Sequence, residues 1–289
     1  MGVLWPAAGR DVFDTGQLPL PEPLSLVTSH YWWVTWRRDP AVPFRQQVLS
    51  HPVVHLTVED AADGRIHGFT TPVCLLHGVV TDVFTVDLPV AGRVAGVAFQ
   101  PGGLAALLDI DVRGLTDTVV HAEEVLGPEV RALSELVLAE SEEGKRRDHV
   151  AAYLSGLLEP RLEAVRADGA YRLVREAVRL MRTHEHTTVA SVADRLHVSP
   201  RHLQRVFARY VGLSPLRVLR RYRLREAAAT LDAGAGSDLA TAAAELGYSD
   251  QAHFTRDFAR VVGVPPARYR RGHLRSAMID DAAGAVPEG

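Results

Sequence analysis

The sequence predicts an α+β chain with a β-rich, sandwich- or barrel-like N-terminal domain, a helical hairpin and an all-helical C-terminal domain. Short runs of β-branched and aromatic residues, spaced about ten residues apart, fill residues 26–99 and predict many short strands. Helical periodicity begins near residue 122. Two helix-turn-helix patterns follow at a spacing of about fifty residues, which indicates duplication of one supersecondary unit. The expected divisions are 1–120, 121–168 and 169–275, with a disordered tail at 276–289.

The composition is that of an ordinary folded protein, but its charge is unevenly divided. Of the 289 residues, 47% are hydrophobic and 23% are charged, and the net charge is −3. Residues 170–275 hold 19 arginines and no lysine against 9 acidic residues, which leaves 13 of the 32 basic and 26 of the 35 acidic residues elsewhere. A basic domain on an acidic body favours a polyanionic partner for that domain alone. With Cys74 as the only cysteine and no apolar run of membrane-spanning length, we expect a cytoplasmic protein without membrane contact.

The first hundred residues predict an irregular arm and then strands. Residues 1–25 contain four prolines and are expected to lack regular structure. The candidate strands are Leu26–Trp36, Phe44–Leu49, Val53–Glu59, Arg65–Phe69, Val73–Val80, Val83–Leu88 and Arg93–Phe99. A short helix at Gly103–Leu108 is expected to close the unit. Alternation places Trp32 and Trp36 on one face of the first strand and Trp33 on the other, so one face is expected in the core and the other is available to line a pocket.

Four histidines in this region (His51, His55, His67 and His77) raise the question of a metal site. His51, His55 and Glu59 share one face of a predicted strand, yet four residues of strand span about 13 Å. Two nitrogens bound to one ion at about 2.1 Å each cannot be that far apart. We therefore expect no metal site and no cofactor. The sequence also contains no phosphate loop, dinucleotide fingerprint or nucleophile elbow.

Residues 122–166 predict an antiparallel helical hairpin. Leu126, Val130, Leu133 and Val137 recur at four-three-four spacing, and a second apolar stripe follows after the polar break at residues 141–145. This pattern leaves two alternatives open. The hairpin packs on its own β domain, or it packs against a partner chain in a homodimer.

Both helix-turn-helix patterns combine a short apolar helix, a tight turn and a second helix opened by a serine. The serines are Ser199 and Ser249, and serine is a favoured N-cap because its side-chain oxygen accepts a free backbone N–H. A spacing of i, i+3, i+4 and i+7 predicts the buried stripe of each second helix. The stripes are Leu203, Val206, Phe207 and Tyr210 in the first unit, and Phe254, Phe258 and Val261 in the second.

The opposite faces of these second helices carry polar side chains and small alanines. Arg205 and Arg256 take equivalent outward positions, each two residues after the first residue of its stripe. Arginine suits bidentate contacts with guanine, and glutamine suits adenine. A linker helix from Pro215 to about Leu231, about 25 Å long, can hold the two units about 34 Å apart, one turn of duplex. Its arginines are candidates for phosphate contacts or acid pairing, and they are Arg217, Arg220, Arg221, Arg223 and Arg225.

The second unit carries the most specific resemblance to a known family. Gly247–Phe258, followed by Gly263–Arg270, is similar to the DNA-binding domain of AraC/XylS-type transcription regulators, and the resemblance extends over residues 171–272. More weakly, His51–Leu56 and Gly96–Gly103 resemble the N-terminal domains of some such regulators. The resemblance implies a non-enzymatic, sequence-specific regulator that contacts double-stranded DNA and RNA polymerase, and it is compatible with a small-molecule effector and a homodimer.

The resemblance also implies which residues contact DNA. The base-reading set is Arg201, Gln204, Arg205, Gln251, Thr255 and Arg256. Apart from the resemblance, we expect phosphate contacts from Ser199, His202, Ser249, His253 and Arg220. Two other functions stay open as alternatives. One is a metal-dependent β-barrel enzyme fused to a DNA-binding domain, and the other is an architectural DNA protein without sequence preference.

Overall fold

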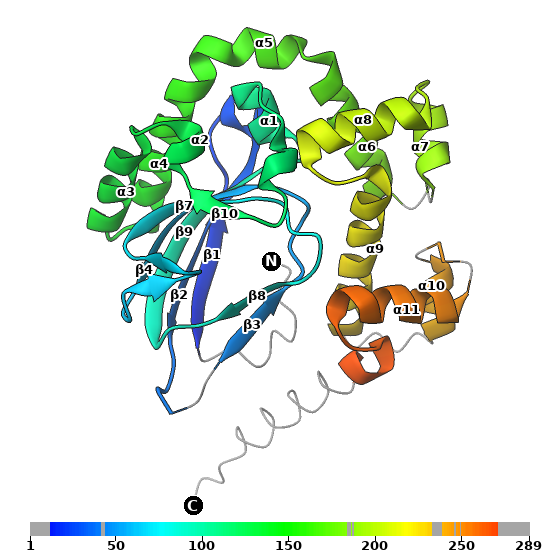
Figure 1. The fold of residues 1–289 in the computed structure, drawn as a ribbon, viewed down its shortest axis with the longest axis horizontal. Helices are drawn as coiled ribbons and strands as arrows, with labels where there is room; N and C mark the ends of the chain where they lie inside the picture. The colour runs from blue at the N-terminus through cyan, green and yellow to red at the C-terminus, as the bar shows by residue number, and fades with distance from the viewer. Residues whose placement is uncertain are drawn as a thin grey trace, which may run out of the picture.

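A six-stranded antiparallel sheet, helices that cover it, and a second set of helices beside it make up the molecule (Figure 1). The computed structural model describes residues 12–41, 44–183, 186, 188–232, 239–245, 247–248 and 250–270. The predicted order of an N-terminal β domain followed by an all-helical domain is confirmed. The predicted tail at 276–289 lies outside the described residues. Within those residues, no helix has the length and apolar character needed to cross a membrane.

The large sheet has the strand order β1-β2-β9-β4-β7-β10. Its strands are β1 (Phe13–Leu18), β2 (Thr28–Arg37), β4 (His55–Ala61), β7 (Val73–His77), β9 (Ala91–Phe99) and β10 (Val119–His121). Two further pairs form short ribbons, and they are β3 (Arg45–Val48) with β8 (Phe84–Asp87), and β5 (Arg65–Ile66) with β6 (Phe69–Thr70). The β3–β8 ribbon lies between the sheet and the lower helices of the C-terminal part (Figure 1).

Two sequence expectations for this region are wrong. The supposed irregular arm contains an edge strand, since β1 pairs with β2 from Phe13 opposite Trp36 to Leu18 opposite Tyr31. Gly16 permits this pairing, because a Cβ there would lie 2.1 Å from a ring carbon of Trp33. The expected single strand Arg65–Phe69 is instead a hairpin, because His67 and Gly68 both adopt positive φ angles and reverse the chain. Strand β10 was also not expected from the sequence.

The two faces of the sheet have different partners. One face packs on the helices through a large core that includes Tyr31, Leu56 and Val97. The other face carries a smaller core around Trp36 and Leu75. The predicted division of the tryptophans follows these faces, because Trp33 packs against the large core while Trp36 is buried in the smaller one.

The helical hairpin packs within its own chain. The helices are α2 (Glu123–Leu126), α3 (Val130–Ala139), α4 (Glu143–Leu158) and α5 (Leu162–Ala167). Leu126, Val130, Leu133 and Val137 are all buried in the large core, and α3 contacts β4 and β7. Of the two alternatives for the apolar stripe, the structure shows the first, packing on the β domain.

The C-terminal helices follow without a loose linker. They are α6 (Gly169–Arg182), α7 (Val189–Arg195), α8 (Pro200–Val211), α9 (Pro215–Asp232), α10 (Leu239–Glu245) and α11 (Gln251–Val262). Asp168 starts α6 as its N-cap, with its carboxylate accepting the N–H groups of Ala170 and Tyr171 at 2.9 Å each. The linker helix expected from Pro215 to about Leu231 is α9, which ends one residue later, at Asp232.

The first helices of this set share a core with the β domain. Two contacts show how closely the parts meet. Tyr171 Oη donates to Leu26 O at 2.7 Å, and Thr116 Oγ1 donates to Gly212 O at 3.1 Å. The short segments α1 (Gly103–Leu108) and η3 (Val112–Leu115) both contact α8. The position of α8 is therefore fixed by the N-terminal domain as well as by its own unit.

Candidate nucleic-acid interface

The first helix-turn-helix unit consists of α7 and α8 with a tight turn at residues 196–199. The Ser199 side chain accepts the His202 N–H at 3.1 Å, which confirms serine as the N-cap of α8. His197 in the turn has a φ of 54°, a left-handed conformation that reverses the chain direction. Gly212 ends α8 in the same conformation with a φ of 79°. Local chemistry thus defines both ends of this helix.

The buried and exposed faces of α8 agree with the predicted periodicity. The buried residues include Leu203, Val206, Phe207 and Tyr210. Arg201, Gln204 and Arg205 are exposed on the other side. Arg205 Nη2 donates to His202 Nδ1 at 2.9 Å, so these two side chains are held together on the exposed face.

The second unit, α10 and α11, has the same plan but a different cap. Asp250, not Ser249, is the N-cap of α11, with its carboxylate accepting the His253 N–H at 2.7 Å. The expected serine cap is therefore wrong for this unit. Aspartate serves equally well, since its oxygen accepts the same free N–H and its charge complements the positive helix N-terminus. Ser249 itself lies outside the described residues.

The faces of α11 also follow the prediction, with one shift. Phe254 and Phe258 are fully buried, but the stripe ends on Val262, and Val261 is only partly buried. Gln251 and Arg256 are exposed, and Thr255 is half-buried beside them. Gly263 ends the helix with a φ of 85°. All six predicted base-reading residues thus lie on α8 or α11, and five of them are exposed.

The predicted phosphate-contacting residues are more strongly engaged within the protein. Asp257, which sequence reasoning missed, is buried on α11 and pairs with three neighbours. Arg220 Nε lies 3.4 Å from Asp257 Oδ2, Arg260 Nη2 donates to Oδ1 at 3.0 Å, and His253 Nε2 lies 3.8 Å from Oδ2. In the sequence, Asp257 is only one acidic residue in a helix that also carries arginines. Its burial, which the structure shows, is what marks it as an ion-pair partner. Arg220 therefore helps to hold α11 on α9, whereas His253 contacts Asp257 within α11.

The arginines of α9 divide between the two domains. Arg221 is buried and its Nη2 donates to the carbonyls of Val80 and Thr81 at 3.0 and 2.6 Å. Burial lowers the pKa of Arg221 to about 10, so the side chain stays charged at neutral pH. Arg225 Nη1 donates to Leu49 O at 2.5 Å. Both side chains bind the β domain, a use that the sequence did not suggest, whereas Arg217 is exposed.

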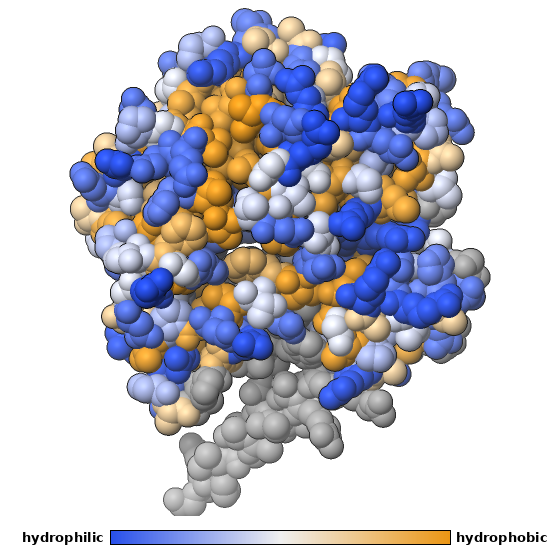
Figure 2. Space-filling view, viewed as in Figure 1, coloured by the Kyte–Doolittle hydropathy of each residue, from blue (hydrophilic) through white to orange (hydrophobic). Residues whose placement is uncertain are grey.

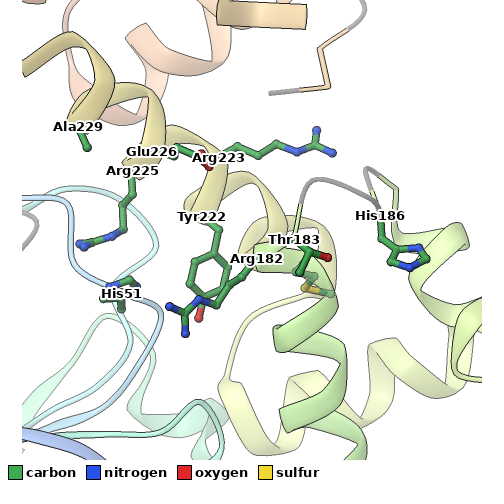
Figure 3. A pocket seen from close by; sticks show the side chains of 10 residues that line it. His51, Arg182, Thr183, His186, Tyr222, Arg223, Arg225, Glu226 and Ala229 are labelled. Carbon is green, nitrogen blue, oxygen red and sulfur yellow. The ribbon is translucent and has the colours of Figure 1, made fainter. Parts of the chain in front are cut away.

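A pocket of about 240 Å³ lies where α6 and α9 meet the β domain (Figure 3). Arg182 and Tyr222 point into the same space, and Arg225 points toward His51. Burial, followed by the nearby Arg225 and Arg182, lowers the pKa of His51 to about 3. His51 is therefore a neutral side chain in a pocket that three arginines line, namely Arg182, Arg223 and Arg225.

Hydrophilic residues are frequent on the surface of the C-terminal helices (Figure 2). Figure 2 shows hydrophilic residues gathered over the C-terminal helices on the right of the view. This agrees with the excess of arginine over acidic residues in this part of the sequence. Two capped helices with outward arginine and glutamine side chains, on a surplus of positive charge, define a double helix-turn-helix DNA-binding domain.

Comparison with known proteins agrees with this class. A helix-turn-helix domain family matches residues 192–272, and a domain of unknown function (DUF6597) matches residues 18–121. A putative AraC-like transcription regulator from Streptomyces lividans is 35% identical over 122 residues, 42% of this chain and 36% of that protein. The arabinose operon regulatory protein of Salmonella typhimurium is 30% identical over 102 residues, 34% of this chain and 36% of that protein. The chain thus spans about a third of each of these curated relatives. Its C-terminal part is an AraC-type helix-turn-helix DNA-binding domain.

Solved structures are also similar. The C-terminal domain of AraT, a response regulator from Geobacillus stearothermophilus, is 29% identical with a TM-score of 0.33, covering 36% of this chain and 88% of that one. ToxT from Vibrio cholerae is 10% identical with a TM-score of 0.41, covering 90% of this chain and 98% of that one.

Proposed function

We propose that the protein is a sequence-specific DNA-binding transcription regulator in which α8 and α11 each enter a major groove. The observation that carries this proposal is the matched geometry of the two helices. Each is capped at its N-terminus, buries an aromatic stripe and exposes arginine and a polar amide or hydroxyl on the opposite face. An α-helix in this orientation presents its outward side chains to base edges.

The proposed base contacts are divided between the helices. On α8, Arg205 reads guanine, with Arg201 and Gln204 beside it. On α11, Arg256 takes the equivalent role, with Gln251 and Thr255 beside it. Arg205 is oriented by its hydrogen bond to His202, which reduces the side-chain entropy lost on binding.

The proposed phosphate contacts are less numerous than the arginine count suggests. Ser199 and His202 are proposed to contact a phosphate at the positive end of α8 together with the backbone N–H of Arg201, because Pro200 has no N–H and the His202 N–H is bonded to Ser199. Ser249 and His253 are proposed for the same role on α11. Arg220 is proposed as an indirect contributor, because its ion pair with Asp257 connects α9 to α11. Exposed Arg217 is a better candidate for direct phosphate contact.

Regulation by an effector in the N-terminal domain is a further part of the proposal. Arg221 and Arg225 connect α9 to three backbone carbonyls of the β domain. Because α9 also joins the two recognition units, a change in the β domain alters the relation between α8 and α11. Contact with RNA polymerase and formation of a homodimer belong to this proposal too. A dimer would need a surface other than the apolar stripe of α3, which the β domain covers.

The enzyme alternative has less support. The relatives that share the helix-turn-helix domain are named as transcription regulators, and we propose that this protein performs no catalysis.

Selection of preferred sites from random duplex tests the proposed function. We expect a site with two conserved segments about one helical turn apart. We also expect the selected duplex to bind about 10³-fold or more tightly than random duplex at physiological salt, with affinity that falls steeply as salt rises. Equal affinity for both duplexes would instead support an architectural role. Arg172→Ala removes one exposed arginine from α6, outside α8 and α11, and should leave the selected site unchanged. It is therefore the control for variants that remove an arginine from α8 or α11.

A further inference from the structure

Three side chains with metal-binding chemistry lie close together in the β domain. Glu59 comes from β4, His77 from β7, and His67 from the turn between β5 and β6. One ligand atom from each lies within 4.8 Å of the other two. Glu59 Oε1 is 2.7 Å from His77 Nε2, and Glu59 Oε2 is 3.4 Å from His67 Nε2.

The carboxylate of Glu59 is incompletely satisfied. Its side chain is 1% exposed, and those of His67 and His77 are 14% and 12% exposed. Thr57 Oγ1 donates to Oε1 at 2.6 Å, but Oε2 accepts no hydrogen bond from any residue that the structure describes. A buried charged oxygen without such a partner is costly, and a cation between the three side chains would remove that cost.

The surroundings hold the two imidazoles in place. The ring centroid of Phe84 lies 5.3 Å from that of His67 and 5.9 Å from that of His77. His67 adopts a φ of 50°, a left-handed conformation that is uncommon for most residues but several-fold enriched in Asn, Asp and His. In the turn between β5 and β6 it reverses the chain, and the His67 Nε2 lies 3.4 Å from Glu59 Oε2.

The ligand chemistry selects the class of ion. Two imidazole nitrogens and one carboxylate suit Zn²⁺ or Fe²⁺, whereas Mg²⁺ and Ca²⁺ prefer oxygen ligands alone. Two atoms bound to one ion at about 2.0–2.2 Å lie at most about 4.4 Å apart, so only small side-chain movements are needed. Thr57 would orient the carboxylate through its hydrogen bond.

We propose that Glu59, His67 and His77 bind one divalent transition-metal ion. This replaces the sequence expectation of no metal site, which considered distances along a single strand. The backbones here are also offset, since Glu59 lies opposite Val73 and His77 lies opposite His55. The ends of the long side chains nevertheless meet. His55 is not part of the site, because its Nδ1 accepts the indole N–H of Trp32 at 3.2 Å.

The position of the site assigns the ion a regulatory role, and this part of the inference rests on the proposed function. His77 ends β7, and Phe84 begins β8. Between them lie Val80 and Thr81, whose carbonyls accept the buried Arg221 of α9. A change in the packing of the ligands is thus transmitted through one short segment to the helix that joins the recognition units. The low exposure of the cluster, with Glu59 buried and both histidines only slightly exposed, favours this role over catalysis, since a substrate must reach a catalytic metal.

Zinc titration of the full chain tests the site. Chelator-treated protein should bind one Zn²⁺ per chain in competition with a chromophoric chelator. Loss of residues that only orient metal ligands typically weakens binding about 10–100-fold, so Glu59→Gln and His67→Asn should each weaken it at least 100-fold. Asparagine tolerates a positive φ, so His67→Asn removes the ligand without disturbing the turn. His121→Asn, an exposed histidine of neighbouring β10, is the control that should bind as the parent does.

Folded metal-free protein that binds no Zn²⁺, or unchanged binding in His67→Asn, would overturn the site. The regulatory role is tested separately by measuring affinity for the selected duplex with and without Zn²⁺. We expect at least a tenfold change for the parent and none for His67→Asn. Zinc binding with constant DNA affinity would refute the effector role alone. Failure to bind DNA in both states would contradict the proposed function as well, while the zinc titration judges the site independently.

Discussion

The two helix-turn-helix units have the same plan but different support. The core of the first unit is continuous with the β domain, since Leu203 and Phe207 belong to the same buried cluster as Tyr31 and Leu56. The core of the second unit is a separate cluster around Phe254 and Phe258, in which the β domain contributes Leu49 and the partly buried Val83. The first recognition helix is thus fixed by the N-terminal domain, and the second mainly by α9.

This difference means that the β domain holds α8 more firmly than it holds α11. Thr116 and Tyr171 tie the first unit to the β domain by hydrogen bonds. The second unit depends on the Asp257 ion pairs and on α9, whose Arg221 and Arg225 reach the β domain. A change of state in the β domain would therefore move α11 relative to α8 more readily than it would move α8.

The largest expected difference comes from truncating the aromatic core of each unit. Phe207→Ala and Phe258→Ala each remove a fully buried ring, and each should cost about 3–5 kcal/mol. The three tryptophans that the structure describes, Trp32, Trp33 and Trp36, all lie on β2, so their fluorescence reports on the β domain. Phe207→Ala should lower the midpoint of this fluorescence transition, whereas Phe258→Ala should leave it nearly unchanged. Hydrogen exchange should then be faster in α10 and α11 of Phe258→Ala alone. Equal shifts of the fluorescence midpoint would show that both units are coupled equally to the β domain.

A smaller effect is expected from the connection between α9 and the β domain. Arg221→Met leaves the carbonyls of Val80 and Thr81 without their donor, at a cost of about 1–3 kcal/mol. We then expect the unfolding midpoint followed by tryptophan fluorescence and the midpoint followed by circular dichroism to lie further apart in Arg221→Met than in the parent protein. The matched control is Arg217→Met on the exposed side of α9, which should change neither. Coincident transitions in Arg221→Met would show that other contacts hold the second unit.

The smallest effect is expected at the N-caps. Ser199→Ala and Asp250→Ala each remove one side-chain acceptor, and each should cost about 1 kcal/mol. Since the first unit shares a large core, Ser199→Ala should shift the global transition. Asp250→Ala should show itself only as faster hydrogen exchange in α11. The reverse pattern would mean that the second unit, not the first, is coupled to the β domain.

The helical half of the fold could be predicted closely because its signals are local. The linker helix starts at Pro215 as expected, and Ser199, Gly212 and Gly263 cap helices as expected. Each of these features depends on residues within one or two turns of each other. The cap at Asp250 was missed because serine and aspartate stand side by side in the sequence, and either can accept the N–H.

The β domain was less predictable because its key relations depend on pairing between distant strands. Strand β1 exists because Gly16 leaves space for Trp33 of β2, a fact that no local pattern contains. The meeting of Glu59 with His67 and His77 depends on the register of β4 against β7 and on a hairpin between them. Similarly, the sequence predicts phosphate or acid partners for the α9 arginines, but Arg221 and Arg225 donate to carbonyls of the β domain.

Under the proposed function, α8 and α11 each contact the bases of a separate DNA segment, and site selection with two single variants can separate their contributions. Arg205→Ala should cost about 1–3 kcal/mol and relax base preference in one segment, while Arg256→Ala should do the same in the other. Because the sites are far apart, the two losses should add in the double variant. Uniform loss of affinity for every duplex, with the parent's full base preference kept in both variants, would contradict the account.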